Sequence, residues 1–216
     1  MIKIINIILV FLAINLSSCN SVQDYRNLML LKDKSKEHQM ESLKYFEQKH
    51  NKKFLKYLIE YYYKTEDIEM KRYSFDIITL LGIMDLSEEV SGGRLYKNSA
   101  TADSSVYPVL LDALGSDDLL LKVTSLTYID DVWRKEYINQ LHQLINDTSY
   151  TIRSMVCGLM GDFGTSDDTT LLKEVILKDS VLYVIECANK SLVKLGGKSI
   201  VDISRKGGHV ILKIKR

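Results

Sequence analysis

The feature that most constrains the fold is a pattern that occurs twice between Tyr137 and Gly197, 32 residues apart. Each copy contains an aspartate, four apolar residues and a glycine: Asp147, Ile152, Val156, Met160, Phe163 and Gly164, then Asp179, Val184, Ala188, Leu192, Leu195 and Gly196. Repetition at this period is typical of stacked helical pairs, in which each pair buries its apolar face against the next. The sequence therefore predicts an all-α fold, an α-α superhelix.

Two earlier segments follow the same pattern less closely. Aligning Met70 with Ile152 brings Lys71 onto Arg153 and ends the match at Gly82, the counterpart of Gly164. A further, weaker copy places Leu121-Lys122 at the position of Ile152-Arg153. We therefore expect about four helical pairs in one domain, residues 36–197, which opens with an amphipathic helix.

Three segments fall outside the repeat pattern. Residues 86–105 are rich in Ser, Gly, Thr and Asp and are expected to form an inserted loop, since long loops of this kind are often functional. Residues 198–216 are expected to cap the last repeat with a short helix and a basic-tipped strand. Residues 19–35 show no clear periodicity and are expected to form a tether.

The N-terminus has the features of an export signal. Lys3 precedes an apolar run, Ile4 to Leu16, that is too short for a comfortable membrane span. The Leu16-Ser17-Ser18-Cys19 stretch that follows resembles the lipobox of bacterial lipoproteins. The resemblance implies removal of residues 1–18 and acylation of Cys19, with palmitate among the acyl chains. The alternative is a secretory signal or an uncleaved anchor, with Cys19 incidental.

The residue after the cysteine predicts where the protein is located, and the net charge argues against one class of partner. Asn20 after Cys19 resembles the outer-membrane rather than the inner-membrane retention pattern, so we expect a protein of the bacterial cell envelope, anchored on the periplasmic face of the outer membrane. The formal net charge of +1 falls to 0 when Lys3 is removed with the signal. A neutral chain lacks the positive charge that nucleic-acid binding requires.

The helical pairs resemble HEAT and HEAT-like repeats. The residues that carry the resemblance are Asn146-Asp147, Ile152-Arg153 and Phe163-Gly164, and Lys178-Asp179, Val184 and Leu195-Gly196. In that family aspartate and arginine form a ladder along the repeats, here Asp147, Arg153 and Asp179, which should end where Ile185 replaces the basic residue. The family resemblance also implies a scaffold that binds a protein partner on the concave face lined by the second helix of each pair.

The candidate partner-binding residues are those on the second helices that lie off the apolar stripe: Lys71, Arg72, Arg153, Glu186, Lys190 and Lys194. The alternative is that they form an ordinary solvated helix face. The tyrosines at 57, 61, 62, 63 and 73 are either an exposed aromatic cluster or core residues.

No catalytic or metal-binding motif stands out. The four histidines lack the spacing of metal ligands, and the acidic pairs at 117–118 and 167–168 are expected to cap helices. Cys157 and Cys187 occupy different repeat positions and are expected to be two buried free thiols. We therefore expect no enzyme and no cofactor. The alternatives are an enzyme or enzyme accessory that uses the 86–105 loop, and a carrier of a small ligand or pigment between helices.

The glycines at 158, 161 and 164 recur every three residues along one helix. Such spacing places small residues on one side of the helix. It indicates either close packing of a neighbouring helix or a groove for a partner.

Substitution of the lipobox cysteine tests the export prediction. Cys19→Ser removes the thiol that would carry the acyl chains, so palmitate labelling should be lost and the protein should leave the membrane fraction. Labelling and fractionation that match the wild type would contradict the prediction.

Overall fold

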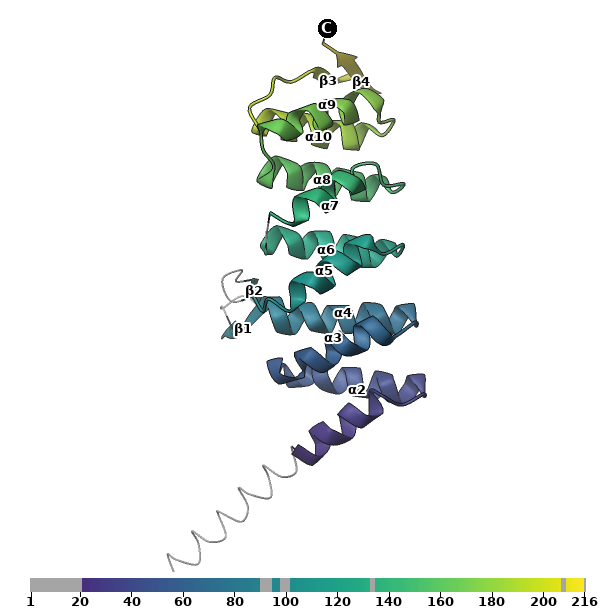
Figure 1. Cartoon of the computed structure of the whole chain (residues 1–216). Coiled ribbons are helices and arrows are strands. Elements are labelled where there is room, and N and C mark those ends of the chain that lie inside the picture. Colours follow the sequence, from purple (N-terminus) through teal and green to yellow (C-terminus); the bar gives the residue numbers. More distant parts are fainter. Residues whose placement is uncertain (1–20, 90–94, 98–101, 133–134, 207–208, 216) are drawn as a thin grey trace, which may run out of the picture. The chain divides into compact units, whose positions relative to one another are not determined.

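The computed structural model of the protein describes residues 21–89, 95–97, 102–132, 135–206 and 209–215. Helices dominate, which confirms the all-α class, and two short two-stranded sheets accompany them (Figure 1). The elements are α2 Lys36–Lys49, η1 Lys52–Phe54, α3 Leu55–Lys64, α4 Ile68–Ile83, β1 Met84–Glu89, β2 Leu95–Lys97, α5 Val106–Gly115, α6 Leu119–Asp131, α7 Tyr137–Leu144, α8 Tyr150–Phe163, η3 Ser166–Asp168, α9 Thr169–Lys178, α10 Leu182–Lys194, β3 Val201–Lys206 and β4 His209–Ile214. The predicted signal peptide and Cys19 lie outside the described residues.

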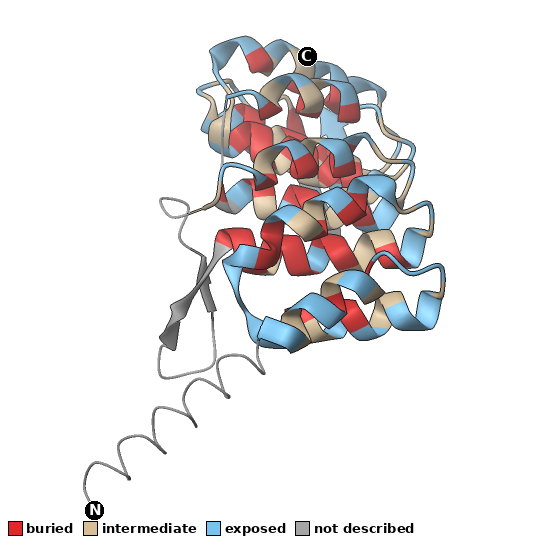
Figure 2. Cartoon of the chain, turned by 60° about the horizontal axis from the view of Figure 1, so that its bottom comes forward, coloured by how far each residue is buried: buried red, intermediate tan, exposed pale blue. Residues whose placement is uncertain are grey.

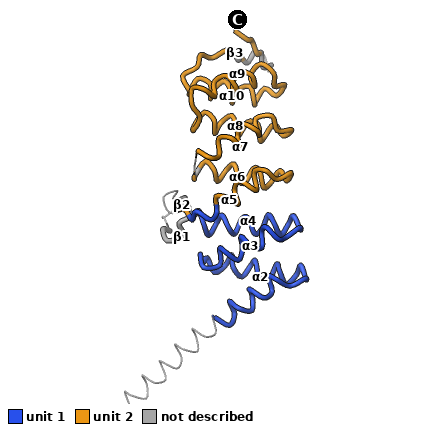
Figure 3. The backbone as a smooth tube through the Cα atoms, in the orientation of Figure 1, with its two compact units in different colours: residues 1–96, 103–106 blue, residues 97–102, 107–216 orange. Residues whose placement is uncertain are grey.

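The chain divides into two compact units where the sequence predicts one repeat domain. Unit 1 consists of residues 1–96 and 103–106, and unit 2 of residues 97–102 and 107–216 (Figure 3). In unit 1, α4 packs against both α2 and α3. In unit 2, α8 packs against α6, α7 and α10, and α10 also packs against α9. Successive helices thus pair as the sequence predicts within each unit.

The residues that repeat in the sequence form the core of unit 2. Six of them have 0% of their surface exposed: Ile152, Val156 and Met160 in α8, and Val184, Ala188 and Leu192 in α10. Their spacing of four residues places them on one side of each helix. Figure 2 colours the buried residues of the helices red. The repeat pattern is therefore a packing pattern.

The segment expected to be a tether is mostly helical, because residues 21–30 form a helix that is attached to unit 1. Ser42 Oγ, in α2, donates a 2.7 Å hydrogen bond to the carbonyl of buried Asn27. Asp24 forms an ion pair with Lys53, with 2.6 Å between Oδ2 and Nζ. The prediction was wrong because it depended on hydrophobic periodicity, and the attached face of this helix carries polar residues that find polar partners.

The inserted segment contains strands. β1 and β2 form a two-stranded sheet, whereas the sequence was expected to be loop over residues 86–105. Residues 90–94 and 98–101 of this segment lie outside the described residues.

The C-terminal segment is a hairpin rather than the expected short helix and strand. β3 and β4 pair antiparallel, with Val201 opposite Ile214 and Lys206 opposite His209. Apolar and polar residues alternate from Val201 to Ser204 and again from Leu212 to Lys215, and this period of two fits a strand and not a helix. Val201 is 4% exposed, and the preceding Ile200 N–H donates to Asn189 Oδ1 of α10 over 3.2 Å. The hairpin is thus attached to the last helix.

In the predicted glycine strip, the middle residue is the one that helix packing between α8 and α10 requires. A Cβ atom at Gly161 would lie 2.5 Å from Ser191 Oγ and 2.9 Å from Ser191 Cα, so α10 approaches the bare backbone there. A Cβ atom at Gly158 would meet nothing within 4 Å. Close packing therefore explains Gly161 but not Gly158.

These two glycines provide a matched pair of substitutions. Gly161→Ala should lower the free energy of unfolding by about 1–3 kcal/mol, because α10 would have to move away from α8. Gly158→Ala should raise it by about 0.5–1 kcal/mol, since alanine favours a helix and meets no obstacle. Urea unfolding followed by circular dichroism measures both, and equal effects at the two positions would contradict the packing explanation.

Candidate functional site

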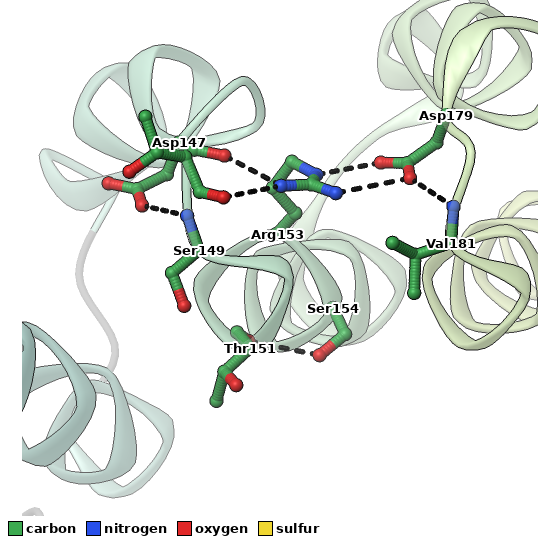
Figure 4. Close-up of polar contacts among 8 residues, drawn as sticks. Asp147, Ser149, Thr151, Arg153, Ser154, Asp179 and Val181 are labelled. Atoms are coloured by element: carbon green, nitrogen blue, oxygen red, sulfur yellow. Dashed lines mark hydrogen bonds and ion pairs between the residues drawn. The ribbon is translucent and has the colours of Figure 1, made fainter.

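Two ion pairs connect successive helical pairs of unit 2. Lys122, in the first turn of α6, places Nζ 2.6 Å from Asp147 Oδ2. Arg153, in the first turn of α8, forks onto Asp179, with 2.7 Å from Nε to Oδ2 and 3.1 Å from Nη2 to Oδ1 (Figure 4). We call Lys122, Asp147, Arg153 and Asp179 the ladder. The pairing of Arg153 with Asp179 confirms the interaction that the repeat resemblance implied, and Lys122 extends it into the weaker copy.

The ladder also holds the turns in front of the helices. The carboxylates of Asp147 and Asp179 each accept the N–H two residues later, from Ser149 and Val181, at 2.8 Å in both cases (Figure 4). Arg153 donates from Nη1 to the carbonyl of Asp147 at 2.9 Å. One guanidinium therefore joins the turn of its own repeat to the turn of the next.

The surroundings of the two aspartates favour their charged forms. Desolvation is the largest single influence on the pKa of Asp179 and raises it, but hydrogen bonds from Arg153 and the Val181 N–H, with the guanidinium charge, together lower the pKa below its usual value. The pKa of Asp147 is lowered in the same way, with Lys122 as the main opposing partner. Both side chains are at most 8% exposed, so solvent screens these interactions weakly.

The ladder removes Arg153 from the candidate partner-binding residues. Its side chain is 16% exposed, and its donors are engaged with Asp179 and with turn carbonyls. At the matching position of α10, Ile185 is 5% exposed and carries no charge, as expected for the end of the ladder.

Three of the other predicted residues share one helix. Glu186, Lys190 and Lys194 lie on α10, where the two lysines are exposed and Glu186 is half-buried. Lys194 forms an ion pair with Asp162 of α8.

The remaining two predicted residues belong to unit 1. Lys71 and Arg72 lie in the first turns of α4 and are both half-buried. Lys71 places Nζ 4.5 Å from the centre of the Tyr62 ring, a cation–π contact within that unit.

A row of exposed apolar residues marks the starts of the second helices in unit 2. Leu119 and Leu120 on α6 are 48% and 55% exposed, Tyr150 on α8 is 54% exposed, and Tyr183 on α10 is 58% exposed. We call these four residues the apolar edge. The charge pattern of these helices does not reveal it. The signal was present in the alignment: Leu119 and Tyr150 both stand two positions before the first buried residue of their helices.

Unit 1 contains a groove between the helix at residues 21–30, α2 and α3. Its volume is about 420 Å³, within the range of small-ligand sites. The residues that line it combine apolar and charged groups: Leu28, Leu31, Lys32, Gln39, Tyr57, Glu60, Tyr61, Lys64 and Thr65.

Of the five tyrosines, two are buried, Tyr57 and Tyr73 are half-buried, and one is exposed. Tyr62 is 0% and Tyr61 is 8% exposed, and the Tyr61 hydroxyl donates to Gln39 Oε1 over 2.8 Å. Tyr63 is 48% exposed. The core interpretation is therefore correct for two of the three consecutive tyrosines.

The acidic pairs behave as helix caps. The Asp118 carboxylate accepts the Leu121 N–H over 3.0 Å at the start of α6. The Asp168 carboxylate accepts the Thr165 N–H over 2.7 Å and completes the capping box of η3. The structure thus confirms capping for Asp118 and Asp168.

Neither described cysteine forms a disulfide. Cys157 is buried and Cys187 half-buried, so the expectation of two buried thiols is correct only for the first. Burial, followed by the charge of nearby Cys187, raises the pKa of Cys157 to about 12. A thiol with so high a pKa is a poor nucleophile.

Among the residues that the structure describes, no group of three or more His, Cys, Asp or Glu side chains could hold a metal ion. The same part of the chain has no helix both long and apolar enough to cross a bilayer.

No model of a protein family matches the chain, and no curated protein matches it.

Removal of the ladder arginine should destabilise unit 2. Arg153→Ala leaves a nearly buried Asp179 without its partner, so we expect a loss of about 2–4 kcal/mol in the free energy of unfolding. Lys178→Ala is the matched control, because Lys178 is 73% exposed in its pair with Glu174 and should contribute no more than about 0.5 kcal/mol. Similar losses in both variants, measured by urea unfolding, would contradict the structural role of the ladder.

The ladder also sets a pH dependence. Because the folded pKa values of Asp147 and Asp179 lie below that of an unfolded aspartate, about 3.9, their contribution is complete above that pH and is lost as the pH falls through the folded values. Arg153→Ala should therefore lose stability less steeply below about pH 4 than the wild type. Parallel profiles for the two proteins would count against the ion pair.

Proposed function

We propose that the protein is a lipid-anchored scaffold of the bacterial cell envelope that binds another protein through unit 2, without catalysis. The proposal combines the lipobox at Cys19 with the stacked helical pairs, which resemble HEAT repeats. The observation that carries the binding function is the apolar edge.

The apolar edge has the properties of a protein-docking surface. It exposes two tyrosines and two leucines at the starts of three helices, and tyrosine is among the residues that contribute most to binding energy in protein interfaces. Neighbouring helices pack about 8–10 Å apart, so three successive helix starts make a row roughly 20 Å long. The ladder fixes these helix starts relative to one another, because each basic residue holds the turn of the next repeat. The row is therefore presented on a rigid support, which lowers the entropic cost of binding.

The charged face of α10 continues from the apolar edge. Tyr183, Glu186, Lys190 and Lys194 are spaced by three or four residues and so share one side of the helix. Interfaces commonly place charged residues around an apolar centre, where they select the partner and speed association. This arrangement retains three of the residues predicted from the sequence, with Tyr183 as the apolar centre that was missed.

A second candidate function is a carrier of a small amphipathic molecule, favoured by the groove in unit 1. Leu28, Leu31 and Tyr57 could contact an apolar body while Lys32 and Lys64 contact a polar group. A small molecule retained in native mass spectra of the protein purified from cells would favour this function.

Substitution in the apolar edge tests the docking proposal. Tyr150→Ser combined with Tyr183→Ser should reduce recovery of a partner crosslinked in intact cells by about 10-fold or more, if each tyrosine contributes about 1 kcal/mol. Leu177→Ser, at a 57% exposed position of α9, is the matched control and should leave recovery unchanged. Lys190→Glu with Lys194→Glu should give a smaller loss, mainly in the association rate.

Equal recovery in the double tyrosine variant and the wild type, with unchanged circular dichroism, would exclude the apolar edge as the docking surface.

A further inference from the structure

The helix at residues 21–30 exposes an apolar stripe on its outer side. Val22, Tyr25 and Met29 are 67%, 66% and 52% exposed, and their spacing of three and four residues places them on one face. Arg26 and Lys32 flank this stripe and are also exposed. A narrow apolar face between basic residues is typical of helices that lie in the membrane interface.

Polar contacts hold this helix firmly on unit 1. The Tyr45 hydroxyl donates to Asp24 Oδ1 over 2.6 Å, and Arg26 forms a 3.3 Å ion pair with Glu41. Asn27 is 1% and Leu31 5% exposed on the opposite side of the helix from the stripe. The stripe therefore has a fixed orientation relative to the rest of unit 1.

The position of the proposed lipid places this helix close to the bilayer. Only Asn20 separates Cys19 from Ser21, and two residues span at most about 7 Å. Ser21 is already helical, so an acylated Cys19 would bring the turn that contains Ser21 into the headgroup region, which is several ångströms deep. This step depends on the acylation included in the proposed function.

The charge of the chain favours the same orientation. Residues 21–64 contain ten Lys and Arg residues and six Asp and Glu residues, a net charge of +4. Residues 65–216 contain 18 Lys and Arg residues and 22 Asp and Glu residues, a net charge of −4. The end of the chain that follows the lipid attachment is therefore the end that anionic phospholipids attract.

We propose that Val22, Tyr25 and Met29 insert into the headgroup layer of the membrane, so that unit 1 rests on the bilayer instead of hanging from it. The acyl chains supply most of the membrane affinity, and the stripe sets the orientation. Lys32 contacts anionic headgroups beside the stripe.

Photo-crosslinking of the full chain in cells tests this orientation. A benzoyl-phenylalanine replaces Tyr25 in one variant and Leu177, a similarly exposed residue of unit 2, in the control. After irradiation, we expect adducts of phospholipid mass at position 25 and none at position 177. Val22→Ser with Met29→Ser, added to the first variant, should reduce the phospholipid adduct, because the stripe then no longer favours the interface.

Palmitate labelling of the same samples distinguishes failure of the lipid anchor from failure of the proposed orientation. Acylated protein that forms a protein adduct at position 25, or no phospholipid adduct there, overturns the orientation and leaves the lipid anchor intact. Protein without palmitate overturns the anchor and, with it, the inference that depends on it.

Discussion

The ion pair between Arg153 and Asp179 is the interaction on which the architecture of unit 2 depends. One guanidinium contacts the carboxylate of the next repeat and the turn carbonyls of its own, so it sets both the local chain direction and the spacing between repeats. Apolar burial supplies the driving force for stacking but is not directional. The buried Asp179 carboxylate finds its hydrogen-bond donors only in this geometry, so it fixes the register between the repeats.

Sequence reasoning recovered the parts of the fold that repeat. Ile152 and Val184 identified buried faces, and Asp147, Arg153 and Asp179 identified the ladder, because the same physical task recurs in each pair and leaves the same residue types. It failed where a segment occurs once. The helix at residues 21–30 attaches through Asp24 and Asn27, whose polar partners lie far along the chain, and no periodicity shows such contacts.

The candidate site was harder to predict than the fold for a related reason. Arg153 was predicted to bind a partner because it is charged and lies on a second helix. A charged residue can serve either packing or binding, and only its surroundings show which. The apolar edge is the opposite case, in which large apolar residues are exposed. Tyrosine is a residue type that is also common in the core. Tyr150 and Tyr183 are exposed because they lie one or two positions before the first buried residue of their helices.

The two rungs of the ladder are chemically unequal. Lys122 reaches Asp147 through a single contact, whereas Arg153 holds Asp179 through two parallel hydrogen bonds. An ammonium is also more strongly hydrated than a guanidinium and gives up its partner to water more readily. Under heat or mechanical tension, unit 2 should therefore separate first between α6 and α8, and the block from α8 to α10 should outlast it as a partially unfolded intermediate.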